Sequence, residues 1–193
     1  MKLTKTLSIL AISSTLLLAQ GQNKKDDEMK LVISEGKNAT KTLLQTLQKN
    51  MQQHMKKGGA MDALNFCSTE AYALTDNVNK KLPKGVSAKR ISIKYRNPAN
   101  EPQDDEMKIL NSLQTLKDTN VIMPGYLLEK VDEHTYKYYK PLVIDKPVCL
   151  KCHGDLSKDS EISKGIAEKY PVDKAVGYKM GDLRGAVVVT IKR

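Results

Sequence analysis

The sequence predicts an α+β protein, with helices in its N-terminal part followed by a mixed antiparallel sheet with crossing helices. Apolar side chains recur four positions apart from Ala39 to Met55, which is the spacing of one face of a helix. After residue 88 the pattern changes to alternating and β-branched runs, which are typical of strands. Helices followed by strands, rather than a regular alternation of the two, indicate α+β.

Composition is typical of a folded globular protein and excludes wholesale disorder. The 193 residues are 40% hydrophobic and 28% charged, and this length fits about one domain. With no Trp and one Phe, the core must be filled by Leu, Val, Ile and Met. The net charge of +10 comes from scattered Lys and Arg rather than a block, which favours a solvated surface over nucleic-acid binding.

Residues 1–21 read as a secretory signal peptide. Lys2 and Lys5 precede an apolar run over residues 7–18, and Ala19 and Gly21 provide the small residues of a cleavage site. The alternative is an uncleaved anchor, but the run is short for a membrane span. We therefore expect a periplasmic protein with no integral membrane segment after cleavage.

The mature chain, residues 22–193, divides into a helical part at 22–80 and a sheet part at 88–193. One helix is expected over residues 26–55 and a second over residues 61–79, with Gly58 and Gly59 breaking the pattern between them. The apolar stripe of the first helix is expected to pack on a neighbouring helix rather than to bind a cofactor, and it also permits a homodimer.

The sheet part is expected to contain four strands and two helices. The strands at 126–131 and 135–144 form a hairpin that turns at 132–134, and the helix at 104–116 begins with acidic residues. The other strands are expected at 89–95 and 185–191, and the second helix at 162–169.

A C-x-x-C-H motif, formed by Cys149, Cys152 and His153, is the strongest functional signal. It is the attachment site of a c-type haem, because two thiols at this spacing reach both vinyl groups and the adjacent His becomes the proximal iron ligand. A thioredoxin-like redox pair or half a zinc site are the rival readings. The motif is followed by a short helix and a strand, which fits neither small electron-carrying cytochromes nor helical-bundle cytochromes, so we expect it on a loop beside the sheet.

The residues alone do not identify the sixth ligand of such an iron. Cys67, the cysteine outside the motif, lies on the apolar face of a predicted helix, where it is either a thiolate ligand or a small core residue. The other candidates are His54, His134, Met123 and Met180, or no residue at all.

The sequence also resembles a family of exported single-haem c-type domains with a PAS-like core, long described as a domain of unknown function. The resemblance extends over residues 64–191 and rests on the motif and on segments 65–68, 90–100, 149–154, 170–173 and 177–186. It implies a PAS-like sheet with long N-terminal helices against it. It also implies one haem c, bound covalently by Cys149 and Cys152, with His153 as proximal and Cys67 as distal iron ligand.

Arg90, Lys94 and Arg96 are candidates for contacts with the haem propionates, since carboxylates that are partly buried pair with Arg or Lys. Plain solvent exposure is the alternative for each of them.

The sequence is compatible with four candidate functions. A redox or gas sensor is placed first, and a periplasmic electron carrier that docks on a redox partner protein is second. An enzyme would need an open iron site and an acid/base group, so none is expected. The fourth candidate is a structural or partner-binding domain in which the haem only stabilises the fold.

Overall fold

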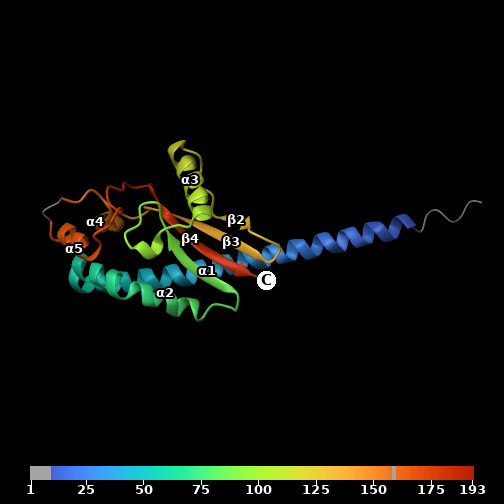
Figure 1. Ribbon diagram of the computed structural model, residues 1–193, viewed down its shortest axis with the longest axis horizontal. Helices are drawn as coiled ribbons and strands as arrows, with labels where there is room; N and C mark the ends of the chain where they lie inside the picture. Colours follow the sequence, from blue (N-terminus) through green and yellow to red (C-terminus); the bar gives the residue numbers. More distant parts are fainter. Residues whose placement is uncertain (1–9, 158–159) are drawn as a thin grey trace, which may run out of the picture.

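The structure is a computed structural model that describes residues 10–157 and 160–193, with side chains from residue 24 onward (Figure 1). The predicted signal peptide is therefore described only as backbone over residues 10–21, and its residues 1–9 lie outside the described residues. None of the helices within the described ranges combines the length and apolar character of a membrane span.

Helices account for the described chain up to Asn79, as predicted. Helix α1 covers Leu10–Thr69 and α2 covers Ala71–Asn79. The expected break lies inside α1, where Gly58 and Gly59 leave the helical conformation. Gly59 has φ 71° and ψ −156°, a region that only glycine adopts readily, so the chain turns sharply there. The second predicted helix is divided at Glu70 between the end of α1 and α2.

Four antiparallel strands form one open sheet in the order β1-β4-β3-β2. They are β1 (Val86–Ile91), β2 (Leu127–Lys130), β3 (Thr135–Val143) and β4 (Leu183–Lys192). The β2–β3 hairpin is confirmed, and β4, the last strand in the chain, lies between β1 and β3. This sheet, with a long helix on one face, is α+β and consistent with a PAS-like fold.

The first strand was wrongly bounded by the sequence pattern, which predicted 89–95. The strand ends at Ile91, because Ser92 turns its backbone N–H to the carbonyl oxygen of Asn100 and its hydroxyl to that of Arg184. At the same point Gly185 has φ 149°, and a Cβ there would lie 2.1 Å from the Ile91 carbonyl oxygen. This close approach ends the regular pairing of β1 with β4.

The remaining helices are α3 (Asp104–Asp118), α4 (Leu150–His153) and α5 (Glu161–Lys169). Short 3-10 turns occur at Pro98–Asn100 and Pro147–Cys149. The C-x-x-C-H motif was expected on a loop, but it lies on the second 3-10 turn and on the single helical turn of α4.

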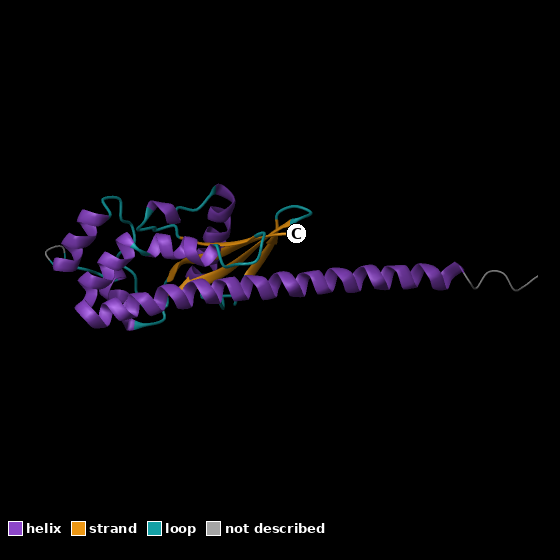
Figure 2. Cartoon of the chain, turned by 90° about the horizontal axis from the view of Figure 1, so that it is seen from below, coloured by secondary structure: helices purple, strands orange, loops and turns teal. Residues whose placement is uncertain are grey.

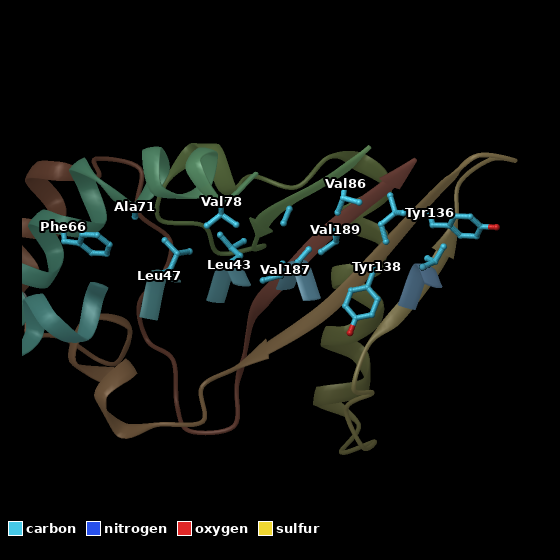
Figure 3. Packing of buried hydrophobic residues seen from close by; sticks show 14 residues of the cluster. Leu43, Leu47, Phe66, Ala71, Val78, Val86, Tyr136, Tyr138, Val187 and Val189 are labelled. Atoms are coloured by element: carbon cyan, nitrogen blue, oxygen red, sulfur yellow. The ribbon is translucent and has the colours of Figure 1, made fainter. Parts of the chain in front are cut away.

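Both faces of the sheet are covered. On one face α1 places Leu43 and Leu47 against Val187 and Val189 of β4, and Figure 2 shows this helix running along the sheet (Figures 2 and 3). On the other face Leu110 of α3 packs with β-strand side chains in a smaller cluster, which comprises Ile91, Tyr139, Ala186 and Val188. The predicted packing of the N-terminal helix against the sheet is thus confirmed.

Candidate functional site

His153 is held by a hydrogen bond from its ring to the backbone. Its Nδ1 lies 2.8 Å from the carbonyl oxygen of Ala175, and because a carbonyl can only accept, Nδ1 carries the hydrogen. Burial, with the positive charges of Arg184, Arg96 and Arg90, lowers the pKa of His153 to about 3. The ring is therefore neutral at pH 7, with the lone pair on Nε2 free to bind a metal.

The loop that carries Ala175 also binds the backbone of the motif. The N–H of Gly177 donates to the carbonyl of Gly154, and the N–H of Tyr178 donates to that of His153, each at 2.9 Å. The ring of Tyr178 meets the His153 imidazole edge-on, with 6.2 Å between the centroids. These contacts fix both the position and the rotation of the imidazole.

Arg96, on the segment after β1, links the motif to the loop that carries Ala175. Its guanidinium pairs with Asp173, with Nε 3.1 Å from Oδ1, and Nη2 donates to the carbonyl oxygens of Cys152 (2.7 Å) and Ala175 (3.1 Å). The arginine and His153 thus share the Ala175 carbonyl as acceptor. The residue is 8% exposed. This role for Arg96 and Asp173 was missed by the sequence analysis, in which Asp173 was only part of a matching segment.

Cys67 reaches the same region from α1. The segment of α1 that follows the glycine break packs on α5 through Leu64, with Ile166 and Tyr170. Burial raises the pKa of the Cys67 thiol and so does nearby Cys152, while Arg90 and Arg96 act in the opposite direction. All three cysteines are free and partly buried.

Arg90 faces this cluster from β1. Its positive charge acts on Cys67 and Tyr170, and desolvation lowers its own pKa. Among the described residues its guanidinium has no hydrogen bond or ion pair, unlike that of Arg96. A carboxylate bound here would therefore find a cation without an anionic partner.

Arg184, at the start of β4, is a further basic residue of this region that the sequence analysis did not single out. Its Nη1 donates to the Ser92 hydroxyl at 2.7 Å and to the Lys94 carbonyl at 3.1 Å. The signal for it lay in the matching segment 177–186, but nothing in the spacing brings β4 next to the motif.

The other ligand candidates lie elsewhere or have partners. His134 is exposed at the β2–β3 turn, at the opposite end of the sheet from α4 (Figure 1). His54 Nδ1 lies 3.2 Å from Asp62 Oδ2, and the ring stacks on Phe66 at 4.9 Å. Met180 is 48% exposed, and Met123 lies on the segment between α3 and β2.

The residues present fit a covalently bound haem. Two free thiols flank a turn that ends in a neutral imidazole with one available nitrogen, and a third thiol and an unpaired guanidinium face the same region. The described part of the chain holds no cluster of three or more His, Cys, Asp or Glu side chains suited to a metal ion.

Comparisons with known proteins agree with this reading of the fold. None of the curated proteins matches the sequence significantly. Among solved structures, the chain is similar to the cyanobacterial heme-protein Tll0287, with a TM-score of 0.56 and 22% identity over 86% of this chain and 96% of the other. The family model of the Tll0287-like proteins matches residues 22–192. This chain therefore belongs to the Tll0287-like family.

Proposed function

We propose that this protein is a periplasmic haem protein that carries one haem c. The observation that carries the proposal is the C-x-x-C-H motif on a helical turn whose His153 donates Nδ1–H to Ala175 and so keeps Nε2 for iron. Membership of a family whose solved relative is described as a heme-protein supports it. The signal-peptide pattern supports export, which amino-terminal sequencing of the mature protein would test.

Each thiol has a proposed role in this scheme. Cys149 and Cys152 form the two thioether bonds, and His153 is the proximal ligand. Cys67 is proposed as the distal ligand, because it lies near enough to Cys152 for that residue to act on its pKa. Burial favours the protonated thiol, whereas the positive charges of Arg90 and Arg96 favour the thiolate, which is the form that binds iron.

Arg90 is proposed as a propionate partner, since a carboxylate would supply the anion it lacks. Arg96 also remains a candidate, although its Nε and Nη2 are already bonded to Asp173 and to backbone carbonyls. Haem bound here would supply one-electron redox chemistry and, with one axial ligand displaced, affinity for diatomic gases.

A redox or gas sensor is the function this arrangement supports best. With His153 and Cys67 as axial ligands, no iron position is open to a substrate. Cys67 lies on the segment of α1 after the glycine break, which connects the long part of α1 on the sheet (Figure 2) to α2, so release of the thiol would free this connecting segment from the site. The second candidate is an electron carrier, which the same closed iron site and the many surface lysines favour.

The test is the absorption spectrum of the haem-loaded protein, ferric and then dithionite-reduced, for wild type and Cys67→Ala. Ser68→Ala is the matched control, because it changes the neighbouring side chain, whose hydroxyl donates to the Asn65 carbonyl of the same helix. We expect a low-spin ferric wild type with thiolate character and a high-spin variant that binds CO. Coincident wild-type and Cys67→Ala spectra would contradict ligation by Cys67 and direct the test to His54 and Met180.

The haem-loaded wild-type protein also distinguishes a sensor from an electron carrier. A sensor predicts that NO or CO changes the spectrum of the reduced wild type. An unchanged spectrum, together with fast electron exchange with a periplasmic cytochrome, would support the carrier instead.

A further inference from the structure

A cavity of about 350 Å³ opens on the α3 side of the sheet, next to the motif but lined by none of its three motif residues or by Cys67. Its wall combines the turn after β1, the start of β4, helix α3 and the loop before β4. The volume lies at the lower end of the range for small-molecule pockets, roughly 300–1,000 Å³. The lining residues used below are Lys94, Leu110, Tyr178, Leu183 and Arg184.

Two cations share one aromatic wall of this cavity. Lys94 Nζ lies 4.5 Å from the centroid of the Tyr178 ring, and Arg184 Cζ lies 5.4 Å from it. Among the described residues, no carboxylate lies within ion-pair distance of either cation. Asp182, the acid in the wall, is instead engaged by Lys117 at 3.9 Å and by the Lys179 N–H at 2.7 Å.

The rest of the wall combines apolar side chains with the polar residues Ser92, Gln114 and Asp182. Leu110 of α3 and Leu183 of β4 face it together with the Tyr178 ring. Lys94 Nζ donates to the Val176 carbonyl, and Arg184 Nη1 donates to the Ser92 hydroxyl and the Lys94 carbonyl, so both cations have neutral partners but no carboxylate among the described residues. A concave site that offers apolar side chains and two such cations suits a small anion with an apolar or aromatic body.

Tyr178 lines the cavity and also contacts His153 of the motif. Its ring lies in the cavity wall and meets the His153 imidazole edge-on, while its N–H donates to the His153 carbonyl. A ligand that moves this ring therefore changes the packing of the imidazole.

We propose that this cavity binds a small carboxylate, with Arg184 and Lys94 as its charge partners, and that Tyr178 couples its occupancy to His153. The binding rests on the cavity itself, whereas the coupling rests on the proposed haem function. The carboxylate has two conceivable sources, a free ligand or a haem propionate, and we assign the site to a free ligand.

The experiment measures calorimetric binding of benzoate to the haem-loaded protein, with uncharged benzyl alcohol as the matched probe. Four proteins are compared, namely wild type, Arg184→Gln, Leu110→Phe and Lys41→Gln. The last removes an exposed lysine on α1 and serves as the charge control. Wild type and Lys41→Gln are expected to bind benzoate but not benzyl alcohol. Arg184→Gln should weaken binding at least about tenfold, the loss of one charge-assisted contact, and Leu110→Phe should weaken it by filling the cavity without removing charge.

Binding of benzoate that is equal in Arg184→Gln and Lys41→Gln would overturn the proposal. Absence of benzoate binding in wild type would also overturn it. If, in that case, the pH dependence of the haem spectrum differs between wild type and Arg184→Gln, the arginine would be assigned to a haem propionate. The coupling has its own readout, a shift of the wild-type haem spectrum at saturating benzoate. A covalent-haem stain after denaturing electrophoresis reports separately on the proposed function.

Discussion

Two regions of the molecule are held together by different chemistry. The central sandwich, α1 against β1, β4 and β3, is packed by apolar side chains such as Leu43 and Val187, which are fully buried (Figure 3). The attachment end, α4 with the loop at 173–178, is held by hydrogen bonds to backbone carbonyls, two of them from Arg96. An apolar core distributes stability over many contacts, whereas the attachment end concentrates it in a few polar ones.

The largest effect is expected from Arg96→Ala. The change leaves Asp173 buried without its partner and removes the donor to the carbonyls of Cys152 and Ala175. Breaking a buried pair in this way costs about 3–5 kcal/mol of unfolding free energy, measured by urea denaturation.

Arg193→Ala is the matched control, because it breaks another arginine–carboxylate pair, to Glu35, at a more exposed site. It should cost about 1 kcal/mol or less. Equal losses for the two variants would show that the attachment end does not depend on Arg96.

In the sandwich, Leu43→Ala should cost about 3 kcal/mol through lost burial and the cavity that remains. Leu31→Ala on the same helix, at a side chain that is 51% exposed, should change stability by about 0.5 kcal/mol or less. Chemical denaturation of both variants, monitored by circular dichroism, checks this. A similar cost at both positions would contradict the apolar packing of α1 on the sheet.

The glycine break joins the two regions, and Gly59→Ala tests it. Alanine is strained at φ 71° and ψ −156°, so we expect a loss of about 2 kcal/mol in thermal or urea unfolding. Gly125→Ala, with open space around its Cβ position, is the control and should have little effect. If Cys67 is the distal ligand, Gly59→Ala should also perturb the haem spectrum, whereas Gly125→Ala should not.

The smallest effect concerns Tyr170, which packs beside the Cys67 segment. Burial raises its pKa to about 12, so the folded state keeps a proton that the unfolded state releases above about pH 10. Stability is therefore lost between pH 10 and 12, by about 1 kcal/mol at pH 11, and Tyr170→Phe should lack this component. Unfolding free energies of both proteins at pH 8 and 11 measure it; an equal loss in the variant would count against the shift.

The sequence predicts the sandwich better than the attachment end for a physical reason. Periodicity is local, so the stripe from Ala39 to Met55 and the β2–β3 hairpin can be recognised in neighbouring residues. The break at Gly58 and Gly59 was equally visible. The end of β1 was misplaced because it depends on Gly185, which is remote in sequence.

In the site, only the C-x-x-C-H motif has a fixed local spacing. Arg96, Asp173 and Arg184 act across long stretches of chain, and no pattern in the sequence pairs them. The contact of Cys67 with this region likewise depends on how α1 turns at its glycines. Its role as a ligand was implied by the family resemblance and stays a prediction.

The order of strands in the sheet has a consequence for how the protein matures. Strand β4 comes last in the chain yet occupies a central position, so β1 and β3 cannot be joined until Leu183–Lys192 are available. Such long-range pairing is a slow step of folding. The motif precedes β4, and its thiols are therefore synthesised before the sheet can close. The covalent attachment of haem proposed for Cys149 and Cys152 can thus act on an open chain, before closure of the sheet fixes the segment in place.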